Sequence, residues 1–346
     1  MDTRAAVAGV LALSALTLVG GGGATPTARA LPRLGLVSFD VRTHEERVFP
    51  PGDLAALSPE ARRLAEARNP DNKECVLRVH RLDGSHDHVL VRSPFPECMG
   101  EPRWSPDGRT IAYLLFTKCT PGAPGCHPEQ LWLVRTSGGA PRLLSNDAGT
   151  AAWAPDARRL AFPGELESGG RARLTIERAD GSGRAQFGGR TYIYSLSWSA
   201  DGRRVLYSTN SPSFADPGPG KIHAVAVATG ADSVIAAGVD PAWSGDGKFL
   251  SFVSRAGSLR TLFLLQHGKR RVILSRRNVD FVHAWCRTGH RLAFAITNRF
   301  GQAKLFLYDP GRPKPLRAVT RGRYGPVRSI TWSPDGRRLL FLRTAG

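Results

Sequence analysis

The segment Trp104-Ser105-Pro106-Asp107-Gly108 decides the fold of this chain, because its pattern returns along most of the sequence. Further copies start 42 to 49 residues apart, at Trp153, Trp198, Trp243, Trp285 and Trp332. The four residues after the tryptophan favour a type I turn, with serine at its first position, proline at its second and glycine at its fourth. A strand-like apolar run follows each copy, as at residues 110–113. Each copy therefore predicts a β-hairpin.

A second hairpin is expected inside each repeat, around glycine-containing turns such as Asp180-Gly181 and Thr229-Gly230. Two hairpins give four strands, which make one blade of an all-β propeller. The motif resembles the WD40-like repeat of the TolB-like family of extracytoplasmic propellers, and the resemblance covers nearly all of the chain beyond residue 30. The copy at Trp285-Cys286-Arg287-Thr288-Gly289 departs most, since it lacks the serine and the aspartate.

The number of blades depends on the two ends of the chain. The run Leu57-Ser58-Pro59-Glu60-Ala61 aligns with the tryptophan motif and predicts one degenerate blade. Residues 34–41 and 46–49 form a hairpin with no partner upstream, and one hairpin remains after Trp332. We expect these two halves to complete one blade and close a ring of seven. If residues 50–70 form a helix instead, for which Ser58 is a good N-cap, six blades result.

Residues 1–30 have the pattern of a secretory signal peptide, with an apolar stretch at 5–19 and Ala28-Arg29-Ala30 before the cleavage point. Residues 31–346 are then a single propeller domain. No later segment reaches 18 consecutive apolar residues, so we expect no transmembrane span after cleavage. The expected location is extracytoplasmic: secreted, periplasmic or associated with the cell wall. A monomer is expected.

Propeller topology sorts the loops into two faces. The turns within hairpins lie on one face, and the connections between hairpins and between blades lie on the other, here named the variable-loop face. Loops of unequal length on it, residues 116–130, 163–171 and 208–221, are where a rigid scaffold usually carries a binding site. Four cysteines also map there, and export permits disulfides, so Cys75–Cys98 and Cys119–Cys126 are the expected bridges. Cys286 should be a free thiol.

Positive charge gathers near the C-terminus. The chain carries 48 Lys+Arg against 29 Asp+Glu, and residues 247–346 hold 21 of those cations but only three acids. Arginines interleaved with aromatic side chains suit carboxylate or phosphate. An arginine-rich but merely solvated surface is the alternative. The candidate binding residues on the variable-loop face, with His283 near the central channel, are Arg190, Tyr192, Arg276, Arg277, Phe281, His283, Arg321, Arg323, Tyr324 and Arg328.

No motif of a hydrolase nucleophile, a zinc peptidase or a phosphate-binding loop occurs, and no catalytic residue, cofactor or metal is expected. The resemblance implies protein–protein contacts at the cell envelope. The favoured function is thus a non-enzymatic scaffold that binds a protein partner or an anionic envelope component. Export argues against nucleic acid. The alternative is a channel-centred hydrolase or lyase acting on an anionic saccharide, which requires acids or histidines on the innermost strands of several blades.

Overall fold

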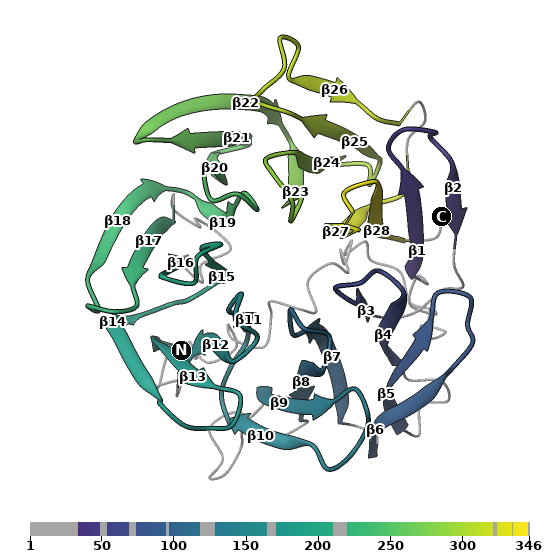
Figure 1. Ribbon diagram of the computed structural model, residues 1–346. Helices are drawn as coiled ribbons and strands as arrows, with labels where there is room; N and C mark the ends of the chain where they lie inside the picture. The colour runs from purple at the N-terminus through teal and green to yellow at the C-terminus, as the bar shows by residue number, and fades with distance from the viewer. Residues whose placement is uncertain are drawn as a thin grey trace, which may run out of the picture.

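A ring of seven four-stranded antiparallel sheets makes up the molecule in a computed structural model (Figure 1). The structure describes residues 34–48, 54–68, 74–94, 97–117, 129–164, 171–209, 220–320, 324–333 and 335–344. Every element in these ranges is a β-strand, which confirms the all-β propeller. Among the described residues, no helix is long and apolar enough to cross a bilayer. The predicted leader, residues 1–30, lies outside the described ranges.

The first four blades follow the chain in order, each written here from its innermost to its outermost strand. They are β3 (Leu54–Leu57), β4 (Arg63–Arg68), β5 (Glu74–Arg81) and β6 (His88–Pro94); β7 (Cys98–Trp104), β8 (Thr110–Phe116), β9 (Glu129–Arg135) and β10 (Arg142–Ser145); β11 (Ala152–Trp153), β12 (Arg159–Pro163), β13 (Ala172–Arg178) and β14 (Ala185–Thr191); and β15 (Ser195–Trp198), β16 (Arg204–Thr209), β17 (Lys221–Ala226) and β18 (Asp232–Ala237).

The remaining three blades carry the C-terminal cations. They are β19 (Val239–Trp243), β20 (Leu250–Ala256), β21 (Leu259–Gln266) and β22 (Lys269–Arg277); β23 (Val279–Trp285), β24 (Leu292–Asn298), β25 (Ala303–Tyr308) and β26 (Leu316–Ala318); and β27 (Val327–Trp332), β28 (Arg338–Thr344), β1 (Leu34–Asp40) and β2 (Glu46–Val48).

The last of these blades joins the two ends of the chain. Strand β1 pairs antiparallel with β28, with Val37 opposite Phe341 and Phe39 opposite Leu339. All four side chains are buried in one apolar cluster that also contains residues of β24, β25 and β27. The predicted closure of the ring is confirmed, and with it the count of seven blades.

The degenerate blade is also confirmed. Residues 54–68 form strands β3 and β4, so the alternative with a helix in this region and six blades is wrong. Ser58 does not cap a helix here; its hydroxyl accepts the Arg63 amide across a tight turn. Ala61 fills the motif's glycine slot with a φ of 57°.

Serine and aspartate of the motif stabilise the turn by local hydrogen bonds. The Ser105 hydroxyl donates to Asp107 Oδ1 at 2.6 Å and accepts the Thr110 amide at 2.9 Å. Gly108, the last residue of the motif, adopts a left-handed φ of 70°. Ala157 occupies the same position in its own copy of the motif and has a φ of 58°. The repeated serine and aspartate are therefore structural residues of the turn.

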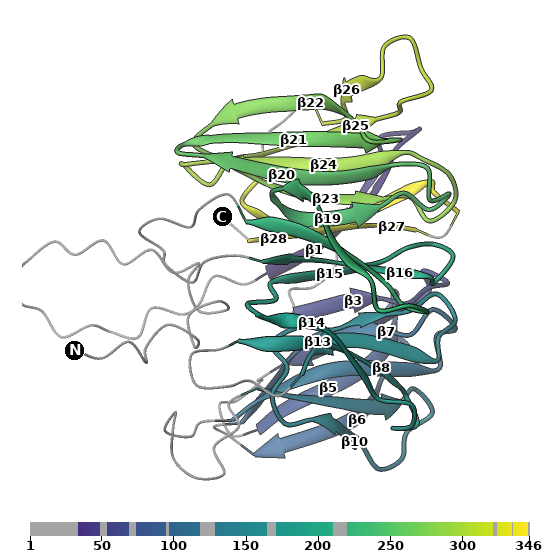
Figure 2. The ribbon, with the colours of Figure 1, turned by 90° about the vertical axis from the view of Figure 1, so that its left-hand side faces the viewer.

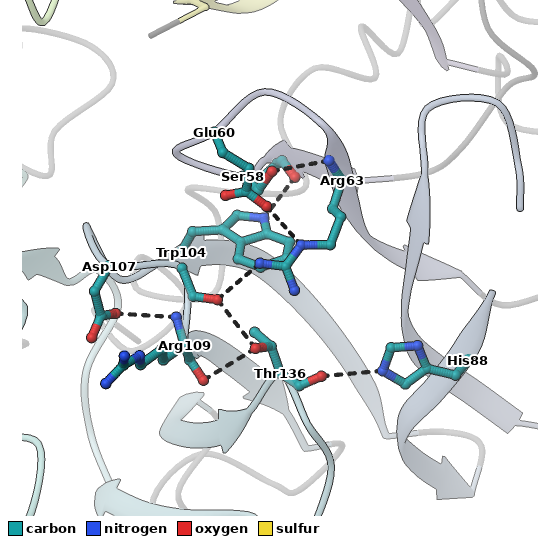
Figure 3. A network of polar contacts seen from close by, with 10 residues as sticks. Ser58, Glu60, Arg63, His88, Trp104, Asp107, Arg109 and Thr136 are labelled. Atoms are coloured by element: carbon teal, nitrogen blue, oxygen red, sulfur yellow. Dashed lines mark hydrogen bonds and ion pairs between the residues drawn. The ribbon is translucent and has the colours of Figure 1, made fainter. Parts of the chain in front are cut away.

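Five of the six repeated tryptophans join neighbouring blades; the exception, Trp243, has no hydrogen-bond partner for its indole among the described residues. The Trp104 indole donates to the carbonyl of Ala56 in the preceding blade at 2.9 Å, and Trp153, Trp198, Trp285 and Trp332 make the equivalent bond. The Arg63 guanidinium lies over the Trp104 ring at 4.8 Å and donates to the Gly108 carbonyl (Figure 3). Arg159 and Arg291 repeat this clamp on Trp198 and Trp332.

One disulfide crosses between blades. Cys75 at the start of β5 is bonded to Cys98 at the start of β7. Cys286 is a buried free thiol, as predicted. The other expected pair, Cys119 and Cys126, lies outside the described residues.

Candidate anion-binding site between two blades

Three arginines line up across the blade of β19–β22. The turn at Gly257 and Ser258 places Arg255 of β20 directly opposite Arg260 of β21. Arg260 in turn lies opposite Arg276 of β22. Directly opposed residues of an antiparallel pair project from the same face of a sheet. We name Arg255, Arg260 and Arg276 the arginine row.

Apolar residues show which face of the sheet carries the arginine row, since each lies two positions from a member of the row on the same strand. Val253, Leu262 and Leu274 lie opposite one another in the same way. They belong to an apolar cluster with Phe281 and Trp285 of β23. The alternation of side chains along a strand then places the arginine row above this cluster, at the boundary with the next blade. In Figure 2 the ends of β20 and β21 reach the left-hand side of the ring, which is the variable-loop face.

Two members of the row have polar atoms without a protein partner. The Nε atoms of Arg255 and Arg260 are buried and make no hydrogen bond among the described residues, whereas Nη1 of Arg260 donates to the carbonyls of Gly257 and Leu259. Burial, together with the neighbouring charge of Arg255, lowers the pKa of Arg260. Like charges that face each other on a sheet destabilise it, and a buried polar group without a partner does the same. The row is therefore suited to an anion that would accept from both arginines.

A pocket of about 260 Å³ opens beside the row, between the blades of β19–β22 and β23–β26. It is lined by Ser258, Arg260, Asn278, Val279, Asp280, Thr297, Asn298 and Arg299. Asp280 is the single carboxylate in this lining, and its charge acts on Arg260. Arg277 donates to the Ser258 hydroxyl at 3.2 Å, which brings a further guanidinium to the edge. We name this space the arginine pocket.

An exposed aromatic side chain contacts Arg299, which lines the arginine pocket. Phe300 follows Arg299 in the turn between β24 and β25 and is 71 % exposed. The Arg299 guanidinium lies 4.7 Å from the centre of its ring. An exposed aromatic beside an arginine is typical of protein-binding surfaces. The sequence contains a signal for this residue, because a phenylalanine stands in the polar turn Asn298-Arg299-Phe300-Gly301. Phe300 was nevertheless not among the predicted binding residues.

The predicted binding residues are only partly brought together. Arg276 belongs to the arginine row, and Arg277 lies at the edge of the arginine pocket. Phe281 was expected at the surface but is 8 % exposed and packs in the apolar cluster below the row. Phe281 lies four residues before Trp285 on the same strand. Residues separated by an even number of positions project from the same face of a strand, so both side chains face the apolar cluster.

The other predicted residues lie elsewhere. Tyr324 packs against Phe341 in the closing blade, its hydroxyl contacts Glu46, and burial raises the pKa of its phenol. Arg190 and Tyr192 lie in and after β14, on a different blade, where Arg171 stacks on Tyr192. Arg321 and Arg323 lie outside the described residues, as does the side chain of Arg328.

His283 and Asp240 lie on neighbouring inner strands. Burial lowers the pKa of His283 to about 4, although a hydrogen bond with the Asp240 backbone acts in the opposite direction. Burial raises the pKa of Asp240, which Arg255 partly offsets. The Nε2 atom of His283 is buried without a partner among the described residues. In those ranges no group of three or more histidines, cysteines and acids is placed to hold a metal ion.

Solved structures share this architecture at low sequence identity. A putative TolB from Agrobacterium tumefaciens is 17 % identical with a TM-score of 0.50, over 92 % of this chain and 100 % of its own. The two chains share the β-propeller fold. The β-propeller domain of the Trilobed protease from Pyrococcus furiosus is 12 % identical with a TM-score of 0.58, over 83 % of this chain and 86 % of its own.

A peptidase is similar to the same degree. The acylaminoacyl peptidase from Pyrococcus horikoshii is 14 % identical with a TM-score of 0.58, and the match covers 83 % of this chain and 48 % of the peptidase. This chain therefore spans about half of that protein's length. No protein-family model matches the sequence. At these identities the likeness shows the fold alone.

Proposed function

We propose that the protein is an exported, non-enzymatic propeller scaffold that binds an anionic protein or envelope ligand at the arginine pocket. The observation that carries the proposal is the arginine row, where Arg255 and Arg260 face each other and their buried Nε atoms make no hydrogen bond within the described ranges. A carboxylate or phosphate fits this geometry, because a guanidinium offers parallel N–H donors to two oxygens of one group.

Export is part of the proposal. It is supported by the signal-peptide pattern of residues 1–30 and by the disulfide between Cys75 and Cys98. Disulfides persist in oxidising compartments outside the cytoplasm. The TolB-like fold agrees with a protein partner at the cell envelope. A protein partner or an anionic envelope component is then the expected ligand, and nucleic acid is not.

The competing function is a hydrolase or lyase centred on the channel. Its support is the pair Asp240 and His283, whose pKa values are shifted on neighbouring inner strands. Against it, the pair comes from only two of the seven inner strands and supplies a single carboxylate, whereas saccharide hydrolysis ordinarily uses two. A polyuronate incubated with the full chain should therefore stay uncleaved, and cleavage that Asp240→Asn abolishes would favour the enzyme.

The scaffold proposal is tested by retention of the full chain on two probes: vesicles containing phosphatidylglycerol and beads carrying polyglutamate. We expect the double variant Arg260→Glu, Arg276→Glu to lower retention at least tenfold on the probe that resembles the natural ligand. Inorganic phosphate is added as a competitor. A lipid ligand gives the loss on vesicles and a protein ligand gives it on beads. The control Arg42→Glu, Arg47→Glu makes the same charge change at exposed positions of another blade. Equal retention of both variants on both probes would overturn the proposal.

A further inference from the structure

The outer strand β22 differs from the other six outer strands of the ring. It has nine residues, whereas β2 and β26 have three, β10 four, β18 six, and β6 and β14 seven each. In Figure 1 it runs as a long arc along the rim of the propeller. An outer strand leaves alternate backbone N–H and C=O groups unpaired, so its length sets how much chain can pair with it.

The other long edges are interrupted in ways that natural proteins use to prevent pairing. Strand β14 contains Gly188 and Gly189, and β6 ends at Pro94. Strand β18 begins with Asp232, which accepts from Tyr207 and contacts His223. Strand β22 contains neither glycine nor proline nor an acid. Its edge therefore lacks these interruptions, and a bulge between Val272 and Leu274 divides it into two segments, residues 269–272 and 274–277.

Cations flank this edge on both sides of its centre. Lys269, Arg270, Arg271, Arg276 and Arg277 are all exposed. Within the described chain, none of the five lies within ion-pair distance of a carboxylate; Arg270 stacks on Phe263 at 4.7 Å and Arg271 donates to Gln266 at 3.3 Å. Between the two groups, Val272 is 58 % exposed. The strand thus combines a free edge, an apolar centre and five cations without acidic partners.

We propose that β22 is the docking edge for an extended acidic segment of a partner protein, which adds a fifth strand to the blade of β19–β22. Main-chain hydrogen bonds to the edge give affinity in such strand addition, and side chains give specificity. Carboxylates on the incoming strand meet the cations at both ends of β22, and an apolar residue covers Val272. The inference does not depend on the arginine pocket, although Arg276 belongs both to β22 and to the arginine row.

The test uses a synthetic ten-residue peptide of alternating glutamate and valine, bound to the full chain and followed by fluorescence anisotropy. In an extended strand, alternate N–H groups point to opposite edges. We therefore compare two derivatives, one N-methylated at every glutamate and one at every valine. One derivative should lose at least tenfold in affinity, because its methyl groups face β22, while the other should bind as the parent does.

Protein variants supply the second arm. Arg270→Glu, Arg271→Glu should weaken binding of the parent peptide at least tenfold. Lys269 is also exposed, and Lys269→Glu should weaken binding severalfold without disturbing the stack of Arg270 on Phe263. Arg42→Glu, Arg47→Glu is the matched control. Arg260→Gln should bind the peptide normally while losing retention on the anionic probes above, which separates this inference from the proposed function. Equal binding of both methylated peptides, or unchanged binding by the Arg270 and Arg271 variant, would overturn the inference.

Discussion

At the scale of single residues, position within the repeat decides what a side chain does. The glycine slot of the motif is left-handed in every described copy that keeps the turn, including those with alanine at Ala61 and Ala157. An L-residue in this region is strained by about 1–2 kcal/mol, whereas glycine is not. The sequence shows which copies lack the glycine, so this strain could be predicted from the alignment of repeats alone.

We expect Ala157→Gly to raise the free energy of unfolding by about 0.5–1 kcal/mol, because relief of the left-handed strain exceeds the added entropy of the unfolded chain. Urea denaturation measures the change. Ala200→Gly is the matched control, since Ala200 occupies a turn position with an ordinary backbone in the equivalent turn. That variant should lower the stability. A loss of stability in both would show that Ala157 is not strained.

At the scale of strands, register decides which side chains meet, and register is only partly readable from sequence. The two-residue turn at Gly257 and Ser258 sets Arg255 opposite Arg260, although neither arginine was among the predicted binding residues. Arg276 could not be placed in the same way, because a bulge between Leu262 and Phe263 shifts the pairing of β21 with β22. The arginine pocket forms only where two blades pack together. No pattern within a single strand predicts how close two blades lie.

Contact between blades is also where the tryptophan clamps act. Arg159 stacks on Trp198 of the next blade at 5.1 Å and donates to the Gly202 carbonyl at 3.2 Å. Arg159→Ala should lower the free energy of unfolding by about 1–2 kcal/mol, from the lost cation–π contact and hydrogen bond. Arg158→Ala, one residue earlier and exposed, is the control in the same denaturation experiment. Equal effects would mean that the clamp contributes nothing.

At the scale of the whole molecule, closure of the ring gives the chain one continuous structure whose ends depend on each other. The sequence predicted this closure from two unpaired hairpins, since a blade needs four strands. It could not predict how the closing blade packs. The first described strand contributes Phe39 to an apolar cluster with Ala293 and Ala295 of β24, far away in sequence. Residues near the N-terminus therefore stabilise the blade that lies beside the arginine pocket.

Closure makes a quantitative prediction about Phe39, which is 2 % exposed. If β1 is an integral strand, Phe39→Ala should lower the free energy of unfolding by about 3–5 kcal/mol, as truncation of a core phenylalanine does. Phe162→Ala is the matched comparison, because Phe162 is fully buried in a blade built from consecutive strands. The two variants should unfold at similar urea concentrations, each in a single transition. A Phe39 variant with nearly wild-type stability would show that β1 is dispensable, and the ring would then be held together by six blades and an unpaired edge of β28.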